Sequence, residues 1–314
     1  MSIQHTLDSK LDQQMLQAGS LITTLLGDAV LPRGGKIWLG SLIQLLLPFG
    51  LNERQIRTAV FRLAKEEWLS NEVHGRRSDY ALTTVGRHRF EKAAQQIYAA
   101  HSPLWDQQWR LIMVVGTLTT KEREYLKKTL FWQGFGKIGS DAFIHPSAEL
   151  NTALDSLISD GMAPLMSVLM PLIATDARLH LSISNKALVD TAWDLDKLAK
   201  SYQTFIHAYQ PVLAELQQSH TIPAQQAFML RTLLIHDYRR LLLRDPQLPD
   251  ALLPQDWPGH QARLLCKEVY LRLQAPSEAY LDEHMRLANG DTPTMLSLLQ
   301  QRFQGAAALL PYTG

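Results

Sequence analysis

The sequence predicts a multidomain protein of the α+β class. Its 314 residues are too many for one small hydrophobic core and suit two or three domains. Hydrophobic residues make up 46% and charged residues 19%, which is typical of a globular chain rather than a disordered one. Three regions differ in pattern: helices followed by a hairpin, strands alternating with helices, and almost continuous helical spacing. We expect three domains, at residues 20–100, 105–185 and 186–314.

Charge and cysteine content exclude several classes of protein. The formal net charge is +1, so any nucleic-acid site must be a local basic patch. Cys266 is the single cysteine and cannot form an internal disulfide. The first twenty residues lack the apolar core of a signal peptide, and the longest apolar stretch, 37–49, is too short to span a membrane. We therefore expect a cytoplasmic protein without membrane association.

The first region has the element order of a winged helix-turn-helix. Apolar residues at helical spacing predict a first helix that ends near Pro32. The elements expected after it are helices at 37–47 and 52–68, a hairpin over 69–83 with its turn at 74–79, and a helix at 85–98. Asn52 and Gln55 have the spacing of a capping box at the start of the third helix. In this arrangement the third helix can enter a major groove of DNA.

One face of the third helix has the residue types of a DNA-reading surface. Ile56, Ala59, Val60 and Leu63 fall on one side and should pack inward. Another side carries Arg54, Arg57, Thr58 and Phe61, flanked by Arg62 and Lys65. Arginine can contact guanine in the major groove or bind phosphate. With the hairpin turn included, the candidate DNA contacts are Asn52, Arg54, Gln55, Arg57, Thr58, Arg62, Arg76 and Arg77.

The local charge favours DNA as the partner of this region. Residues 51–92 hold nine Lys or Arg against six Asp or Glu, a local excess of three positive charges. A charged helix face can instead be merely solvated, and some winged helices bind protein, so a protein-binding scaffold is an alternative. Two adjacent arginines, Arg76 and Arg77, have no evident structural need at a hairpin tip, which favours DNA binding.

The second region alternates strands with helices, which suits a ferredoxin-like fold. Strands are expected at residues 109–115, 135–144 and 168–174, and helices at 121–132 and 149–158. We expect the middle strand to be a single strand kinked at Gly136 and Gly139.

The third region predicts a helical bundle with one long loop. Helical spacing runs through residues 186–305, with breaks expected at Pro211, Pro223, 245–258 and Pro276. A basic group within it recurs at helical spacing and could hold phosphates: His236, Arg239, Arg240 and Arg244. The alternative is an exposed basic stripe, or salt bridges to the neighbouring aspartates.

Catalytic and metal-binding motifs are missing from the sequence. His236 and Asp237 are adjacent and cannot face each other on a helix, so they are not expected to form a catalytic dyad. The 11 histidines are scattered, and no His-x-x-x-His, Cys-x-x-Cys, Gly-x-Ser-x-Gly or phosphate-loop motif occurs. We expect no catalytic residues, no metal and no cofactor.

Two long runs resemble the PaaX family, negative regulators of phenylacetic acid degradation operons. The run GDAVLPRGGKIWLGSLIQLLLPFGLNERQIRTAVFRLAKEEWL, with the SNEVHGRRSDYALTTVGRHRF that follows, resembles the helix-turn-helix region of the family. The run LIHDYRRLLLRDPQLPDALLPQDWPG resembles its C-terminal domain. The resemblance covers roughly residues 20–300.

The resemblance implies a repressor of phenylacetate catabolic genes that binds double-stranded operator DNA as a homodimer. It implies that phenylacetyl-CoA is the inducer that lifts DNA binding. Candidate residues for this effector are the basic group with two aromatic partners: His236, Tyr238, Arg239, Arg240, Arg244 and Trp257. An acyl-CoA thioester hydrolase that uses His236 is the alternative from the enzyme class.

The central domain of the family is similar to the Cas2 ferredoxin-like fold and is expected to support dimerisation. Cas2 nucleases carry an aspartate at the end of the first strand. Here residues 114–117 read Val-Val-Gly-Thr and supply no carboxylate to hold a metal, so we expect no nuclease activity.

Overall fold

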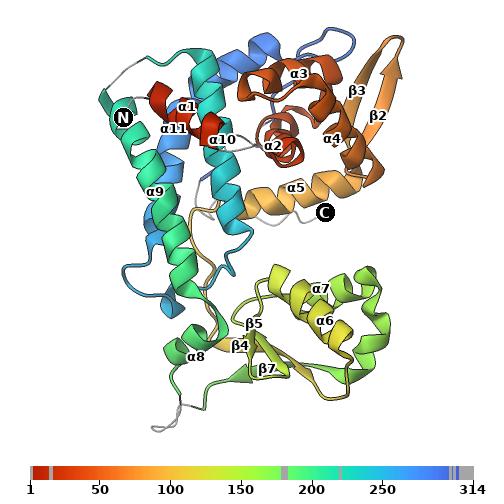
Figure 1. The fold of residues 1–314 in the computed structure, drawn as a ribbon, viewed down its shortest axis with the longest axis vertical. Helices are drawn as coiled ribbons and strands as arrows, with labels where there is room; N and C mark the ends of the chain where they lie inside the picture. Colours follow the sequence, from red (N-terminus) through yellow and green to blue (C-terminus); the bar gives the residue numbers. More distant parts are fainter. Residues whose placement is uncertain are drawn as a thin grey trace. The chain divides into compact units, whose positions relative to one another are not determined.

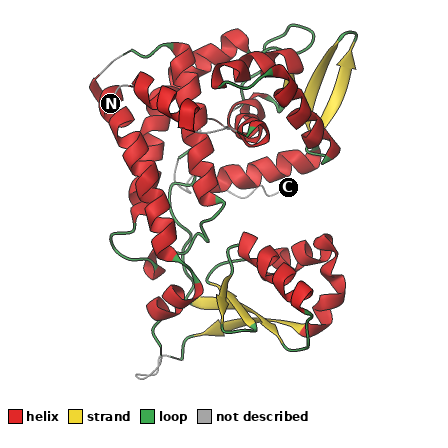
Figure 2. Cartoon of the chain, viewed as in Figure 1, coloured by secondary structure: helices red, strands yellow, loops and turns green. Residues whose placement is uncertain are grey.

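The computed structural model divides the chain into two compact units (Figure 1). The residues that the structure describes are 3–13, 17–177, 183–218, 221–296, 299 and 302–303. The first unit comprises residues 1–100, 203–239 and 260–314, and the second unit comprises 101–202 and 240–259. Each unit contains helices and a small sheet, which confirms the mixed α+β class (Figure 2). The first 100 residues, expected to hold the helix-turn-helix region, therefore share one unit with most of the C-terminal helices.

Among the described residues, the N-terminal part of the first unit has five α-helices and a three-stranded sheet. Its elements are α1 (Ile3–Gln13), α2 (Ala18–Leu25), β1 (Lys36–Trp38), α3 (Leu39–Leu46), α4 (Glu53–Lys65), β2 (Leu69–His74), β3 (Arg77–Leu82) and α5 (Thr84–Ile97). The strand order is β1-β3-β2 with antiparallel pairs throughout, and Ile37 lies opposite Tyr80. The order α2, β1, α3, α4 and the β2–β3 hairpin is typical of a winged helix-turn-helix.

Two boundaries in this part differ from the sequence prediction. The helix expected at 37–47 begins only at Leu39, because residues 36–38 form β1 and pair with β3. The hairpin turn comprises only Gly75 and Arg76, rather than residues 74–79. Gly75 has a φ of 62°, which a two-residue hairpin turn requires at its first position. Strand pairing decides both boundaries, with the distant β3 in the first case and within the hairpin itself in the second, and helical periodicity does not indicate either pairing.

The first helix of the helix-turn-helix region ends near Pro32, as predicted. After α2 the chain continues through a π-helical turn, η1 (Leu26–Val30), and a 3-10 turn, η2 (Leu31–Arg33). Gly34 then ends the helical segment with a φ of 86°. The π-helical turn contains Asp28, whose side chain is buried. Such turns are rare and often occur at functional sites.

The second unit contains the β-α-β-β-α-β order typical of ferredoxin-like folds. Its elements are β4 (Gln108–Val114), α6 (Thr120–Trp132), β5 (Gly136–Ile138), β6 (Ala142–His145), α7 (Leu150–Leu157), β7 (Leu169–Thr175) and α8 (Asn185–Ala192). The antiparallel sheet has the order β5-β6-β4-β7. The single kinked strand expected at 135–144 is wrong: β5 and β6 are two strands of a hairpin, joined through Gly139 with a φ of 59°.

The two faces of this sheet differ in burial. Ile112 and Leu169 pack with α6 and α7 in a common core. Strand residues alternate between faces, so their neighbours Met113 and Met170 belong to the other face. Met113 and Met170 lie opposite each other in the sheet and are 36% and 46% exposed. The second face therefore carries partly exposed apolar side chains.

Three long helices follow: α9 (Leu195–Gln218), α10 (Ala224–Leu242) and α11 (Pro258–His284). The predicted break at Pro223 and the loop at 245–258 are confirmed, and the loop contains a short 3-10 turn, η6 (Asp250–Leu252). The breaks expected at Pro211 and Pro276 are wrong, because both prolines lie inside helices. An interior proline removes one backbone hydrogen bond at a cost of about 3 kcal/mol.

Burial on both sides of each proline offsets this cost. Tyr209 and Val212 flank the first proline, and Leu273 and Ser277 flank the second, all fully buried. Among the helices of the described residues, none is long and apolar enough to cross a bilayer.

Candidate nucleic-acid interface

Helix α4 begins with a complete capping box. The Asn52 side chain accepts a hydrogen bond from the Gln55 N–H at 2.9 Å, and the Gln55 side chain accepts one from the Asn52 N–H at 2.9 Å. Such a box satisfies two backbone donors that no helical carbonyl can reach. Both residues were candidates for DNA contact, and the structure gives them a local structural role. Their contact with DNA stays a prediction.

The inner side of α4 is apolar and its outer side is basic. Ile56, Val60 and Leu63 are buried, and the helix packs against α2, α3 and β2. The outer side carries the exposed residues Arg54, Arg57, Thr58, Phe61, Arg62 and Lys65. The structure therefore places Arg54, Arg57, Thr58 and Arg62 together on one helix surface, as the sequence predicted.

The ion pairs on α4 are local and solvent-exposed. Arg57 lies 2.6 Å from the Glu53 carboxylate, and Arg62 lies 3.4 Å from the Glu66 carboxylate. Exposed pairs of this kind contribute about 0–1 kcal/mol, so phosphate can replace the carboxylate at little cost. Within the described part of the chain, Arg54 and Lys65 form no ion pair. The outer face of α4 is thus open to an anionic partner.

The two hairpin arginines have different surroundings. Arg76 is exposed in the turn and has no ion-pair partner among the residues that the structure describes. The Arg77 guanidinium lies over the Trp38 ring, 4.7 Å from its centroid, and donates to the Ala288 carbonyl at 3.2 Å. The structure therefore leaves Arg76 available for an anion, whereas Arg77 holds the tip of the hairpin against Trp38 and Ala288.

Three of the effector candidates lie on α10 and contact other helices of the first unit. The Thr24 hydroxyl lies 3.2 Å from Nδ1 of the buried His236. Arg239 donates to the same hydroxyl at 3.2 Å and to the hydroxyl of Ser20 at 2.9 Å. Tyr238 is buried, with its ring 5.5 Å from that of Phe205. His236 and Arg239 therefore hold α10 against α2, whereas Tyr238 packs against α9. Their contact with an effector stays a prediction.

The other effector candidates belong to the second unit. Arg240 and Arg244 are exposed. Trp257 is buried, and its ring packs edge-on against that of Tyr202, with 5.9 Å between the centroids. The six candidates are thus divided between the two units, and of the three in the second unit only the two arginines are exposed.

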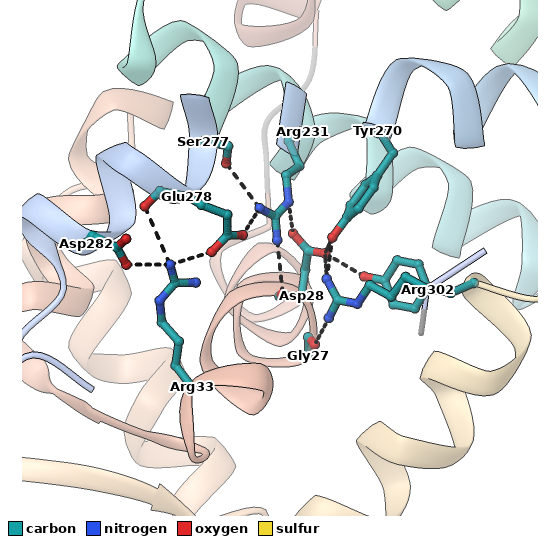
Figure 3. A network of polar contacts seen from close by, with 10 residues as sticks. Gly27, Asp28, Arg33, Arg231, Tyr270, Ser277, Glu278, Asp282 and Arg302 are labelled. Carbon is teal, nitrogen blue, oxygen red and sulfur yellow. Dashed lines mark hydrogen bonds and ion pairs between the residues drawn. The ribbon is translucent and has the colours of Figure 1, made fainter. Parts of the chain in front are cut away.

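Sequence reasoning missed a buried network of charges centred on Asp28 (Figure 3). The Asp28 carboxylate accepts hydrogen bonds from Arg231 of α10 at 2.9 Å and from Arg302 at 2.7 Å. The hydroxyls of Tyr98 and Tyr270 donate to the same carboxylate at 2.6 and 3.0 Å. Burial alone would raise the pKa of Asp28, but Arg231 and Arg302 outweigh it and hold that pKa below its ordinary value.

The network continues to α11 and back to the helix-turn-helix region. Arg231 also pairs with Glu278, which pairs with Arg33. Arg33 reaches Asp282 at 2.8 Å. Three arginines and three carboxylates thus join α10, α11, Arg302 and the end of the first helix within one unit. The sequence did contain a signal: Arg231 lies inside the apolar run FMLRTLLI, and Asp28 lies inside LLGDAVL. Burying either charge without a partner would be costly, so each indicates a buried partner of opposite charge.

The second unit contains a small cleft between α6 and the end of α7 with the turn that follows it. Its volume is about 280 Å³, and its lining consists of Tyr125, Lys128, Thr129, Trp132, Gln133, Ser156 and Asp160. This volume is below that of a usual ligand pocket. The described residues contain no group of three or more His, Cys, Asp or Glu that could hold a metal ion.

Comparison with known proteins identifies the relatives of this chain. The family model "PaaX-like protein" matches residues 17–86, and "PaaX-like protein C-terminal domain" matches residues 193–283. The Transcriptional repressor PaaX of Escherichia coli (strain K12) is 39% identical over 290 residues, which cover 91% of this chain and 90% of the relative. An uncharacterized protein from Mycobacterium tuberculosis of known structure is 20% identical, with a TM-score of 0.48, over 76% of this chain and 89% of its own.

Proposed function

This chain belongs to the PaaX-like family, and we propose that it is a cytoplasmic transcriptional repressor of phenylacetate catabolic genes. It binds double-stranded operator DNA through α4 and the β2–β3 hairpin. The observation that carries this proposal is the charge of the outer face of α4. That face exposes four cations, Arg54, Arg57, Arg62 and Lys65, while the apolar side of the helix is buried. Arginine at such positions can read guanine or bind phosphate in a major groove.

We propose further that the repressor is a homodimer formed through its Cas2-like ferredoxin-like part. The partly exposed sheet face with Met113, Met170 and Leu172 supports this assignment, because a two-fold dimer would bury it. Two copies of α4 then meet successive major grooves of a pseudo-palindromic operator. No carboxylate follows β4 at residues 114–117, in agreement with a binding role for this part rather than a nuclease role.

Phenylacetyl-CoA is the proposed inducer. It can release DNA only by binding more tightly to a form of the dimer that does not fit the operator. Arg240 and Arg244 are the proposed phosphate contacts, because both are exposed. Arg239, the third arginine of the sequence prediction, already binds Ser20 and Thr24.

A gel-shift experiment tests the repressor assignment. A labelled promoter fragment should be retarded by the protein and released by phenylacetyl-CoA. Arg57→Ala should weaken binding by about 1–3 kcal/mol if it reads a base. Unchanged affinity for both Arg57→Ala and the double variant Arg76→Ala/Arg77→Ala would defeat the assignment of the interface.

Calorimetry with phenylacetyl-CoA tests the effector site. The Arg240→Ala/Arg244→Ala variant should lose affinity, and full binding by an Arg239→Ala/Arg240→Ala/Arg244→Ala variant would refute the location. The enzyme alternative is tested in the same samples, since a thioester hydrolase releases free thiol and a repressor does not.

A further inference from the structure

Phe61 lies on the outer face of α4, but binding of phosphate or guanine gives this side chain no role. Its ring is 69% exposed on a helix whose other large apolar side chains are buried. Single exposed apolar side chains are common on protein surfaces. Phe61 is distinguished by its place, because it lies one turn after Arg57 and one turn before Lys65, in the middle of the basic face.

The side chains at the centre of this face form one stripe along α4. In order they are Arg54, Thr58, Phe61 and Lys65, spaced four, three and four residues apart. The Thr58 hydroxyl donates to the backbone carbonyl of Arg54 at 2.8 Å, so the methyl group is what Thr58 offers to a partner. Two apolar groups therefore lie between the two cations of the stripe.

A stripe with a cation at each end and apolar groups between them favours a partner that has closely spaced negative charges with an apolar group between them. A neutral protein surface that covered the Phe61 ring would also desolvate Arg54 and Lys65 without supplying counter-charges. Duplex DNA offers both features, because phosphates flank the major groove and each thymine exposes its 5-methyl group within it. A-form RNA does not, because side chains cannot read its deep and narrow major groove.

We propose that Phe61, together with the Thr58 methyl, contacts a thymine methyl in the major groove and makes α4 selective for thymine at that position. This proposal rests on the proposed binding of operator DNA through α4. An exposed aromatic ring can also bind nucleic acid in two other ways, and neither of them requires a thymine methyl in the major groove. A wedge between base steps acts from the minor groove, and a ring that stacks on a single-stranded base does not depend on the methyl group.

The test compares a labelled promoter duplex with the same duplex in which uracil replaces every thymine. This replacement removes the methyl groups and keeps the base pairing. Fluorescence anisotropy of the wild-type protein should show a loss of about fourfold in affinity for each methyl that the ring contacts. Phe61→Ala should bind the thymine duplex more weakly than the wild type and lose less affinity than the wild type on the uracil duplex, because only the Thr58 methyl then remains against the thymine.

Arg54→Ala is the matched control, because it lies on the same stripe. It should weaken binding to both duplexes and keep the wild-type ratio between them. Equal affinity of the wild type for the two duplexes overturns the role of Phe61 while leaving DNA binding intact. A Phe61→Ala variant that keeps the full wild-type preference for thymine overturns it as well. If the wild type shows no salt-dependent binding to either duplex, the proposed repressor function fails together with this inference.

Discussion

Arginine serves two opposite purposes in this molecule, as a comparison of α4 with the network around Asp28 shows. On α4, the side chains of Arg57 and Arg62 are 54% and 68% exposed and pair with glutamates four residues away. In the network, the side chains of Arg231 and Arg302 are 1% and 6% exposed. Their common partner, Asp28, lies 203 and 274 residues away in the sequence. The arginines of α4 are therefore exposed and have partners close in the sequence, whereas the arginines of the network are buried and have a partner far away in the sequence.

This difference determines what each group can do. An exposed guanidinium loses little when it exchanges a carboxylate for phosphate, so the arginines of α4 are available for binding. A buried guanidinium that loses its partner becomes an uncompensated charge, so the arginines of the network must keep their carboxylates. The network therefore holds the C-terminal helices against the helix-turn-helix region within the first unit, and α4 is left to meet a partner.

The largest expected effect follows from removing the charge at the centre of the network. Asp28→Asn leaves Arg231 and Arg302 buried without their counter-charge and should lower the free energy of unfolding by about 3–5 kcal/mol. Urea denaturation followed by circular dichroism measures this change. Glu268→Gln, which breaks the exposed pair with Arg272 on α11, is the control and should change stability by less than about 1 kcal/mol. Equal effects of the two substitutions would contradict the comparison.

The same network should depend on pH in a defined direction. The pKa of Asp28 lies below its ordinary value in the folded protein, so its contribution is complete above the unfolded-state pKa of about 3.9. That contribution is lost as the pH falls through the folded-state pKa. The difference in unfolding free energy between the wild type and Asp28→Asn should therefore be constant above about pH 5 and shrink below about pH 4. Denaturation curves across this range check it, and a gap that widens on acidification would contradict it.

Features with a local signal could be predicted from the sequence. The capping box at Asn52, the faces of α4 and the end of helix α9 before Pro223 each depend on residues within a few positions of one another. The basic part of the candidate site was predictable for the same reason. Once α4 is known to be a helix of 13 residues, the sequence positions alone determine which side chains share a face.

Features that depend on distant partners could not be predicted. Strand β1 has only three residues and exists because β3 pairs with it. The Arg239 side chain, predicted to bind phosphate, is held by α2, more than 200 residues earlier in the chain. The same holds for Asp28, whose partners come from four separate segments. Periodicity indicates that a position is buried, but it does not indicate which residue meets it there.

Among the exposed cations of α4, Arg54 allows DNA binding and stability to be separated. Arg54→Ala should change operator affinity without changing the free energy of unfolding. It should reduce operator affinity by about 1–3 kcal/mol if it contacts a base. The free energy of unfolding should stay within about 0.5 kcal/mol of the wild type, because the side chain is exposed. Lys127→Ala, which removes an exposed cation from α6, is the matched control and should leave operator affinity unchanged. Equal losses for both variants would mean that only the overall charge matters.

A smaller effect is expected at Asn52, where capping and DNA contact make different predictions. Asn52→Ala should lower the free energy of unfolding by about 1 kcal/mol through loss of the cap. Asn52→Ser keeps a capping oxygen and should restore stability. If Asn52 serves only as a cap, the serine variant also keeps operator affinity. Strong loss of affinity in a stable serine variant would show that the amide reads DNA.

The smallest expected effect is at Arg76, where the hairpin supplies one exposed cation. If Arg76 meets a phosphate, Arg76→Ala should weaken binding about equally on specific and unrelated duplexes. It should also reduce the slope of log affinity against log salt concentration by about 0.9, the value for one phosphate contact. Arg77→Ala is the comparison, because Arg77 already binds Trp38 and Ala288. Its salt slope should stay at the wild-type value, and an equal change in both slopes would place both arginines on the DNA.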